Sequence, residues 1–577
     1  MERQWVIAPR VEDDIVRQLL ANRGVRPDDG AAFLSPDWER GTHSPWLFTK
    51  MRHAVDRVFA ALANGERIMI HGDYDADGVS GSALLYGALQ DIAKKMAGCG
   101  DPAYQQYIAG LPAGRLGVFL PDREKDGYGV AMHTVERLAA EGTKLLLTVD
   151  CGIANADQLD HAHELGVDVV ICDHHQLGDR LPAHAIMLHP LAPGEEYPNK
   201  VLCGTGVAFK LASALFDEAR KRGAAFPVGY EKWMLDLVAV ATVTDVMPLL
   251  GENRVLEHFG LTVLRKTKRP GLLAILASAG VDLDTIDTET IGFRIGPRLN
   301  AAGRLTSASH AFDALAADDM VAAQRAAATL ETLNRERQGM FAKAYDEARA
   351  MVDAAEAAPV LVVWKDDWLP GIVGLIAGRL VGDYGVPAFA FARVGGQYVG
   401  SGRSVGGLHL VEAMNACGDM FVRKGGHPQA CGLTIADESL VRDFQARIGE
   451  FARTFFGGPR PAQTLPIDVE LPLEHATWEL LGDVARCAPF GEGNRAPIFA
   501  ACGVSVLAAE TMGNRANHLR LSALDGAGQA RKLVGFGFGE WAARLHMGDR
   551  VDVAYTLEVN IWNGRRELQL RIVDLRV

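Results

Sequence analysis

The chain has 577 residues, too many for one ordinary hydrophobic core, and this length predicts three or four domains. Hydrophobic residues make up 48% of the chain, yet no apolar run approaches about 18 residues, which argues against a membrane-spanning segment. The net charge of −13 excludes a protein that coats nucleic acid through its overall charge. A polyanionic substrate therefore has to meet a local positive groove or metal ions.

Residues 1–45 form a short lead-in of mixed character. Its first stretch, MERQWVIAPRVEDDIVRQLL, has acids and arginines within the apolar run and lacks the order of a secretory signal, so we expect a cytoplasmic location. The eight cysteines show no CxxC spacing, which argues against a zinc knuckle or a disulfide framework. We expect reduced thiols.

The region 46–317 alternates apolar strands with helices. A helical pattern from Met51 turns at Asn64-Gly65 into the strand of RIMIHGDYDADG, and two more short strands follow, in KLLLTVDCGI at 144–153 and VDVVICDHH at 167–175. Strands rich in Val, Ile and Leu that alternate with helices predict an α/β domain with a doubly wound parallel sheet. Such sheets bind ligands beyond the carboxyl ends of their strands.

Three further parts are expected after this region. Residues 318–357 are rich in Ala, Glu and Arg and free of Pro, and predict a long connector helix. A second α/β domain is expected at 358–457. The composition of 458–577 changes to short alternating strands, and the Asn563-Gly564 pair predicts a hairpin turn. We interpret this last part as a small β-barrel.

Aspartates and histidines gather at the ends of the apolar runs, in four clusters. These are His71, Asp73, Asp75 and Asp77; Asp150; Asp173, His174 and His175; and Asp245, which we expect to end a fourth strand at the same edge of the sheet. One such acid alone is usually an N-cap or turn residue. Several carboxylates share a site only if cations offset their repulsion.

The four clusters predict a site for two divalent cations, with Asp150 placed to bridge them. The excess of carboxylates and the lack of paired thiolates favour Mn²⁺ or Mg²⁺ over zinc. Two such ions, about 3.5 to 4 Å apart, promote the hydrolysis of phosphoesters. The residues themselves leave Asp236 and Asp245 both open as ligands.

The motifs HGDYDADG, VDCG, DHH and TDVMPLLGENR resemble, in order and spacing, those of the DHH phosphoesterase superfamily. More closely, the chain resembles the RecJ family within it, from about residue 45 to residue 577. The resemblance includes PDREKDGYG (121–129), GTG (204–206), IGPRLNAAGRL (295–305), the GSGRS and GGH elements of the associated DHHA1 domain, and PFGEGN (489–494) before an OB-like domain.

The resemblance implies a metal-dependent exodeoxyribonuclease. It would digest single-stranded DNA from the 5′ end to 5′-mononucleotides, in DNA repair and recombination. His71, Asp75 and Asp150 would hold one ion, and Asp77, Asp150, His174 and Asp245 the other, while Asp73 is a turn residue or a ligand. The implied catalytic residues are Asp75, Asp77, Asp150, His174, His175 and Asp245, with His175 on a substrate phosphate and Asp173 orienting a ligand histidine.

Substrate contacts are implied in both α/β domains, which would face each other across a cleft that admits one strand. The residues are Arg123, Arg298, Asn300, Arg304, Ser401, Arg403, Ser404, Gly425, Gly426 and His427. In the barrel, Trp562, Arg565, Arg566 and Arg571 form either a DNA-binding face or an ordinary hairpin surface. The implied partners are single-stranded DNA, a single-strand-binding protein and a RecQ-type helicase, and we expect a monomer.

Two positions depart from the family pattern, which has a histidine at Leu369 and an asparagine at His189. Residues 93–118 look like an insertion of unknown purpose. One alternative function is a phosphodiesterase for short oligonucleotides or cyclic dinucleotides with the same two ions. A second is a non-catalytic DNA-binding scaffold. It predicts that some ligand positions have lost their metal-binding side chains, but every proposed position has an aspartate or a histidine.

Overall fold

The computed structural model describes residues 3–112, 114–123, 125–458, 463–562 and 565–577. They form two compact units. The larger contains Thr42–Met247 and Gly251–Pro461, and the smaller contains Met1–Gly41, Pro248–Leu250 and Ala462–Val577. The turn expected at Asn563-Gly564 and the side chain of Trp562 lie outside what the structure describes.

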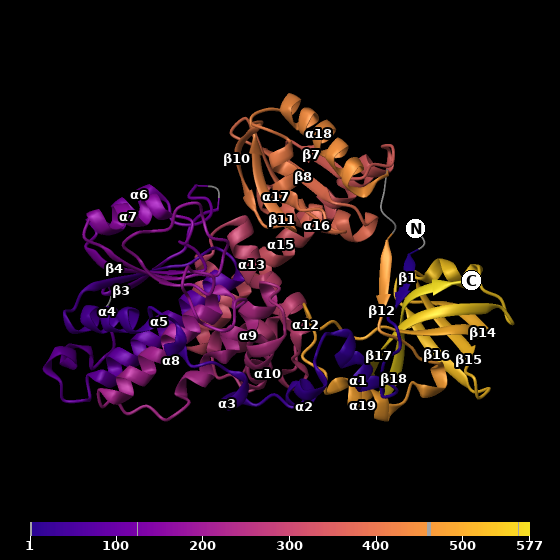
Figure 1. Cartoon of the computed structure of the whole chain (residues 1–577), viewed down its shortest axis with the longest axis horizontal. Helices are drawn as coiled ribbons and strands as arrows, with labels where there is room; N and C mark the ends of the chain where they lie inside the picture. Colours follow the sequence, from indigo (N-terminus) through magenta and orange to yellow (C-terminus); the bar gives the residue numbers. More distant parts are fainter. Residues whose placement is uncertain (1–2, 113, 124, 459–462, 563–564) are drawn as a thin grey trace. The chain divides into compact units, whose positions relative to one another are not determined.

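The larger unit opens with a parallel sheet whose strands lie in the order β3-β2-β4-β5-β6. The strands are β2 (Arg67–His71), β3 (Leu116–Phe119), β4 (Thr143–Val149), β5 (Asp168–Cys172) and β6 (Ile186–Leu188). All neighbouring pairs are parallel. The predicted doubly wound sheet is confirmed (Figure 1).

Helices cover both faces of this sheet. Met69, Leu146 and Val169 pack with residues of helices α6 (Met132–Ala140) and α7 (Ala156–Glu164). Helices on the opposite face are α4 (Met51–Ala63), α5 (Ala76–Met96) and α8 (Gly204–Lys221) (Figure 1). Because successive strand residues point to opposite faces, burial on both sides requires the continuous apolar runs seen in the sequence.

The strand order reverses between β2 and β4. The chain leaves β2 for the edge strand β3 and then crosses back to β4 on the other side of β2. His71 is the last residue of β2, and Asp150 directly follows β4. Open parallel sheets bind ligands in the crevice beyond such a reversal, so the topology places the two residues where a site is expected.

Asp245 does not end a strand, and our expectation of a fourth strand there is wrong. It caps the C-terminus of helix α9 (Leu235–Thr244), in which every residue from Leu235 to Thr242 is buried. A helix buried on all sides is apolar all round and shows no amphipathic period. Periodicity cannot distinguish such a short run from a buried strand.

A helical region follows and leads into the expected long helix, which is confirmed. Its helices are α10 (Gly251–Leu264), α11 (Pro270–Ser278), α12 (Thr288–Thr290), the π-helix η6 (Ile291–Ile295), α13 (Gly296–Leu305), α14 (Ser309–Leu315) and the long α15 (Met320–Asp353). The Asp319 side chain caps α15 by accepting hydrogen bonds from the backbone N–H groups of Val321 and Ala322. This cap explains where the long helix begins.

The second α/β domain contains a mixed sheet in the order β10-β11-β9-β8-β7. Its elements are β7 (Leu361–Lys365), α16 (Pro370–Tyr384), β8 (Ala388–Val394), β9 (Gln397–Arg403), α17 (Leu410–Ala416), β10 (Phe421–Gly426), β11 (Ala430–Ile435) and α18 (Glu438–Phe456). Residues of α15 and α16 form a core on one face of the sheet, and residues of α17 and α18 on the other. The long helix therefore belongs to the core of this domain as well.

The segment 93–118 is not one loop. It contains the end of α5 and most of β3, with a short 3₁₀ helix, η3 (Pro102–Tyr107), between them. The buried Tyr107 donates a hydrogen bond from its hydroxyl to the carbonyl oxygen of Leu62 at 2.7 Å. The segment thus packs against the end of α4, which makes it a part of the fold.

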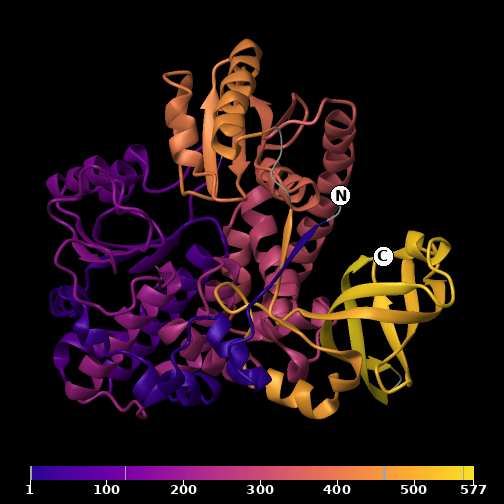
Figure 2. The same cartoon turned by 45° about the vertical axis from the view of Figure 1, so that its right-hand side comes forward.

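The smaller unit contains a closed β-barrel, as predicted (Figures 1 and 2). Its strands are β14 (Phe499–Met512), β15 (His518–Leu524), β16 (Ala530–Gly535), β17 (Arg550–Trp562) and β18 (Arg565–Arg576), with β13 (Val469–Glu470) beside β14. They run β14-β15-β16-β18-β17, and pairing of β17 with β14 closes the barrel. The short helix α19 (Trp478–Ala485) precedes it.

The N-terminal lead-in belongs to the same unit as the barrel, which the sequence did not predict. Strand β1 (Gln4–Ile7) pairs in parallel with β12 (Thr464–Ile467), and α1 (Ile15–Asn22), α2 (Gly30–Leu34) and α3 (Trp38–Gly41) follow it. Arg23 donates hydrogen bonds to Asn494 and Asp468, which are far along the chain. The place of this segment depends on pairing with residues far along the chain. A four-residue strand is too short to show a periodic pattern in the sequence.

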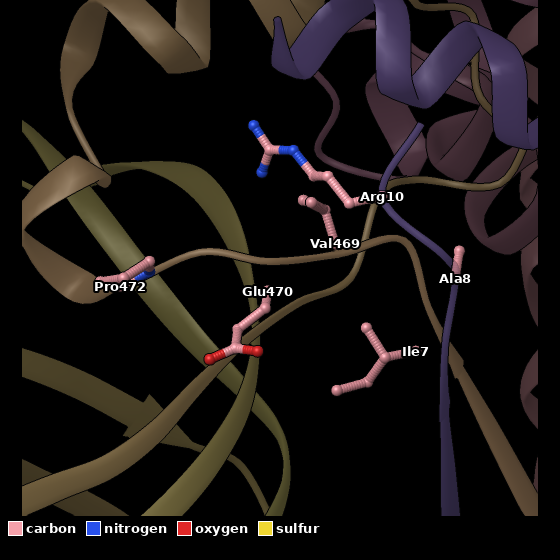
Figure 3. Close-up of a pocket in the computed structure, with 6 residues that line it drawn as sticks. All are labelled: Ile7, Ala8, Arg10, Val469, Glu470 and Pro472. Carbon is pink, nitrogen blue, oxygen red and sulfur yellow. The ribbon is translucent and has the colours of Figure 1, made fainter. Parts of the chain in front are cut away.

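A pocket lies near the end of β1 in the smaller unit (Figure 3). Its lining residues are Ile7, Ala8, Arg10, Val469, Glu470 and Pro472. None of them is among the residues that the sequence marks for chemistry. Among the described residues, no helix is long and apolar enough to cross a membrane.

Candidate metal centre

The turn after β2 brings three aspartates to the N-terminus of α5. Asp75 caps this helix, because its Oδ1 accepts hydrogen bonds from the backbone N–H groups of Asp77 (3.0 Å) and Gly78 (3.1 Å). A Cβ atom at Gly78 would lie 2.4 Å from the backbone nitrogen of Asp73, so only glycine allows this close approach. Asp75 therefore has the ordinary capping role as well as its place in the cluster.

Asp77 faces a second helix N-terminus. Its Oδ2 accepts a hydrogen bond from the backbone N–H of Gly204 at 2.7 Å, and its Oδ1 accepts one from Thr205 at 2.8 Å. These are the first N–H groups of α8, which have no partner within the helix. The first turn of α8 thus fixes the Asp77 carboxylate in place.

Asp150 has an unusual backbone. Its φ is +62°, in the left-handed region that residues other than glycine seldom occupy. Gly204 approaches it so closely that a Cβ there would lie 2.6 Å from the Cβ of Asp150. Backbone strain of this kind is concentrated at functional sites, and the neighbouring glycine makes room for it.

His174 lies among three carboxylates from different elements. Its Nε2 is 3.2 Å from Oδ1 of Asp150, 3.3 Å from Oδ2 of Asp245 and 4.0 Å from Oδ2 of Asp77. Nε2 of His174, Oδ1 of Asp150 and Oδ2 of Asp245 all lack a hydrogen-bond partner within the described part of the chain. These atoms come close to one another without hydrogen-bond alignment.

Three groups of side chains in the described residues bring their ligand atoms within 4.8 Å of one another. They are Asp77, His174 and Asp245; Asp73, Asp75 and Asp150; and Asp150, His174 and His175. Asp150 and His174 each occur in two groups, so the groups merge into one cluster. Asp73, which the sequence left open as a ligand, lies inside it, whereas His71 belongs to none of the three.

His71 is buried beside the cluster. Its Nε2 has no hydrogen-bond partner among the described residues, and its Nδ1 lies 3.6 Å from Sγ of Cys151. Oδ1 of Asp73 is likewise buried and unpaired. An unsatisfied buried polar atom costs about 1–3 kcal/mol. Five such atoms, from His71, Asp73, Asp150, His174 and Asp245, fit a site completed by cations.

Burial sets the protonation of these groups. Burial and neighbouring carboxylates raise the pKa of Asp73, Asp75, Asp150 and Asp245, because the cluster holds many negative charges away from water. Burial lowers the pKa of both His71 and His174 to about 4, so both rings are neutral at pH 7. Neutral imidazoles and carboxylates that repel each other are suited to binding divalent cations.

Comparison with known proteins agrees with this geometry. Residues 67–242 match the N-terminal domain of the DHH family, residues 357–454 the DHHA1 domain, and residues 467–574 the RecJ OB domain. The single-stranded-DNA-specific exonuclease RecJ of Salmonella typhimurium is 33% identical over 586 residues, which cover 97% of this chain and 95% of the relative. The chain belongs to the RecJ family.

Other members of the RecJ family give the same result. The single-stranded-DNA-specific exonuclease RecJ of Bacillus subtilis is 33% identical over 98% of this chain and 68% of its own length. Among solved structures, RecJ of Thermus thermophilus in complex with Mn²⁺ matches with a TM-score of 0.80 and 29% identity, covering all of this chain and 79% of that one. The Mg²⁺ complex of the same protein matches with a TM-score of 0.73.

Asp173 contacts the ring of His175, and its Oδ1 also accepts a hydrogen bond from the backbone N–H of His174 at 2.7 Å. Its Oδ1 accepts a hydrogen bond from Nδ1 of His175 at 2.9 Å, and its Oδ2 accepts one from the backbone N–H of Ile153. Burial lowers the pKa of His175, but the bond to Asp173 and the charges of nearby carboxylates outweigh burial, so the pKa is raised. The pair therefore favours a protonated His175 that can face a phosphate.

His189, where the family resemblance implies an asparagine, also supports the DHH segment. It is fully buried; its Nε2 donates a hydrogen bond to the carbonyl oxygen of His175 at 2.8 Å, and its Nδ1 accepts one from the backbone N–H of Leu191. The ring thus offers a donor and an acceptor, as an asparagine amide does. The other departure, Leu369, is the N-cap of α16, makes no side-chain cap and packs against the apolar core.

Three of the arginines expected to bind substrate lie near each other, with a fourth that the sequence did not suggest. Burial lowers the pKa of Arg304 to about 9, and the charges of Arg123, Arg337 and Arg403 contribute to this decrease. Arg337 comes from the long helix α15, and its Nε is buried without a hydrogen-bond partner among the described residues. Nothing in the local pattern of that helix marks it. The four guanidinium groups form a positive region in an acidic chain.

The remaining predicted substrate residues differ in their surroundings. Arg298 is buried in an ion pair with Glu331 at 2.8 Å, and Asn300 accepts a hydrogen bond from the backbone N–H of Ala76 at 2.8 Å. The hydroxyl of Ser404 donates to the carbonyl oxygen of Leu408. These three side chains have structural partners, and their contact with DNA stays a prediction.

The second α/β domain reaches the centre through His427. Its ring lies 5.7 Å from that of His175, between centroids, and its backbone N–H donates to Ala430. The neighbouring Gly426 has a φ of +142° and passes so close to Ala430 and Cys431 that a Cβ would lie 2.5 Å from them. Gly425 adjoins it on β10, and Ser401 lies on β9 beside these strands.

Proposed function

We propose that this chain is a metal-dependent exodeoxyribonuclease that digests single-stranded DNA from the 5′ end to 5′-mononucleotides, in DNA repair and recombination. The observation that carries the proposal is the cluster of buried carboxylates and neutral histidines with unpaired atoms, beside four arginines. Membership in the RecJ family, whose relatives are named single-stranded-DNA-specific exonucleases, supports the same substrate.

Two divalent cations, Mn²⁺ or Mg²⁺, are the cofactors in this proposal. When bound, two such ions generate the nucleophile from water and offset the charge on the phosphoryl oxygens. We assign His71, Asp75 and Asp150 to one ion and Asp77, Asp150, His174 and Asp245 to the other. The grouping of Asp77, His174 and Asp245, and the place of Asp150 in two groups, support this assignment. The grouping of Asp73 with Asp75 and Asp150 supports Asp73 as a further ligand of the first ion.

The protein residues around the ions hold and orient the substrate. His175, whose pKa is raised by its hydrogen bond to Asp173, would donate a hydrogen bond to a phosphate oxygen. Arg123, Arg304 and Arg403 would hold further phosphates, since guanidinium groups bind phosphate oxygens in pairs. Such contacts read the backbone and not the bases, which suits an exonuclease that degrades any sequence.

The barrel would bind the strand outside the centre. Small barrels of this OB-like type bind single strands through a positive groove and aromatic stacking. Among its described residues, Arg571 lies 5.6 Å from the ring centroid of Phe536, which is exposed on the surface. We propose that Arg565, Arg566 and Arg571 track phosphates there. A cytoplasmic location, a monomeric state, and a single-strand-binding protein and RecQ-type helicase as partners remain part of the proposal.

Substrate length separates this function from the alternative, a phosphodiesterase for short oligonucleotides or cyclic dinucleotides. The test incubates the protein and Mn²⁺ with a long linear strand, the same strand ligated into a circle, dinucleotides and a cyclic dinucleotide. We expect the linear strand to be degraded and the circle to persist. Fast turnover of only the dinucleotides, or of the cyclic dinucleotide, would favour the alternative.

A further inference from the structure

Tyr128 contacts the backbone of the central carboxylate. It lies between β3 and α6, and its hydroxyl donates a hydrogen bond to the carbonyl oxygen of Asp150 at 3.2 Å. Its ring lies 5.2 Å from that of His175, with 55° between the planes. The residue is 45% exposed, so burial of an apolar ring does not explain its place.

The turn around Tyr128 is held in place without help from Asp150. Gly127 and Gly129 on either side have φ values of +78° and +84°, a conformation that favours glycine. Oδ1 of Asn155 accepts a hydrogen bond from the backbone N–H of Val130 at 3.1 Å and packs against Gly129. The tyrosine hydroxyl therefore comes from a turn that is already fixed to the start of α7.

The backbone of Asp150 needs such support. A left-handed conformation is unfavourable for a residue with a Cβ atom, because the Cβ lies too close to the following carbonyl oxygen. The N–H of Asp150 donates to the carbonyl oxygen of Cys172 at 2.9 Å, and its carbonyl accepts from Tyr128, so both sides of the residue are held. A rotation of this backbone would carry the carboxylate away from Asp75 on one side and His174 on the other, with which it is grouped.

We propose that Tyr128 is a positioning residue for metal binding. Its hydroxyl holds Asp150 in the left-handed conformation in which one carboxylate serves both ion sites. This inference rests on the proposed function. It predicts that the hydroxyl, and not the ring, determines the affinity for Mn²⁺ before any DNA is bound.

The test compares Tyr128→Phe with wild type in two measurements. Titration of the DNA-free protein with Mn²⁺, with free Mn²⁺ followed by electron paramagnetic resonance, should show affinity weakened about three- to tenfold, as the loss of one hydrogen bond implies. The Mn²⁺ concentration for half-maximal cleavage of single-stranded DNA should rise by the same factor. Cleavage at saturating Mn²⁺ should stay within about twofold of wild type, because no group that contacts the substrate is lost.

Tyr107→Phe is the matched control, since the Tyr107 hydroxyl donates to the carbonyl oxygen of Leu62 in the same unit but away from the cluster. It should lower the melting temperature and leave Mn²⁺ affinity unchanged. Unchanged Mn²⁺ affinity in Tyr128→Phe would overturn the inference, as would an equal loss in both variants. A wild-type protein that binds Mn²⁺ but leaves single-stranded DNA intact would overturn the proposed function and not this assignment.

Discussion

At the scale of single residues, the centre depends on groups that are costly by themselves. Asp150 has a strained backbone and a carboxylate whose pKa is raised by burial and by the neighbouring carboxylates. His174 keeps a neutral ring with an unpaired Nε2. Such features lower the stability of a metal-free protein, and cations that bind only the folded chain would recover it. The same positions therefore link activity to metal-dependent stability.

Asp150→Asn tests the shared carboxylate. Asparagine tolerates the left-handed conformation, so the fold should persist, while the loss of one charge weakens both ion sites. We expect cleavage of single-stranded DNA with Mn²⁺ to fall at least about a hundredfold. Asp168→Asn is the control: Asp168 also lies on the sheet, at the start of β5, but pairs with Arg57 at 2.6 Å. Near-normal cleavage by Asp150→Asn would rule out the shared ligand.

At the scale of elements, the first turn of α8 shapes the centre. The N–H groups of Gly204 and Thr205 hold the carboxylate of Asp77, and Gly204 makes room for Asp150. A Cβ at Gly206, two residues on, would meet only side-chain atoms, those of Leu202 at 3.3 Å and of Cys203 at 3.6 Å. A side chain at Gly204 would therefore clash with Asp150, whereas one at Gly206 would meet only movable side chains.

Alanine substitutions at these two positions should separate the effect of a clash with Asp150 from the effect of alanine's higher helix propensity. Gly204→Ala would place its Cβ against Asp150 and should destabilise the protein by about 1–3 kcal/mol and reduce Mn²⁺-dependent cleavage. Gly206→Ala should lie within about 1 kcal/mol of wild type, since alanine favours a helix and the leucine can move. Urea denaturation and cleavage assays measure both. Equal effects at the two positions would contradict this account of Gly204.

The elements also show how much of the fold could be predicted from the sequence. The strands ending at His71, Val149 and Cys172 could be predicted because each is a short run of Val, Ile, Leu and other apolar residues. Acidic residues follow each run, and the parallel order of the strands brings those residues to one edge of the sheet. The helix before Asp245 could not, because a run buried on all sides has no period. The neighbourhood of Arg337, the approach of Gly204 to Asp150 and the pairing of β1 with β12 depend on contacts between distant segments, which no local pattern records.

At the scale of the whole molecule, the net charge of −13 contrasts with the positive group formed by Arg123, Arg304, Arg337 and Arg403. The acidic chain repels DNA in general, and this group offers a local site of opposite charge. The carboxylates of the neighbouring cluster have raised pKa values, so protons and cations compete for the same oxygens. Stability should therefore respond to pH and metal together.

The melting-temperature increase caused by Mn²⁺ should grow from pH 6 to pH 8. The pKa values of Asp73, Asp75, Asp150 and Asp245 are raised, so their contribution to the stability of the metal-free fold is present at low pH and lost as pH rises through those values. Mn²⁺ has to displace the protons that these carboxylates hold, and their number falls as pH rises. His71 and His174, with pKa values of about 4, carry no competing proton there. Thermal melts with Mn²⁺ and with a chelator measure this; a constant increase would contradict it.

The central claim, exonucleolytic hydrolysis of single-stranded DNA from the 5′ end, is tested most directly with one strand labelled at either end. The wild-type protein with Mn²⁺ should release a 5′ label at once as a mononucleotide, whereas a 3′ label should remain on a strand that shortens progressively. Asp150→Asn under the same conditions should leave both labels on full-length DNA. Immediate release of the 3′ label, or an intact strand with the wild-type protein, would contradict the account.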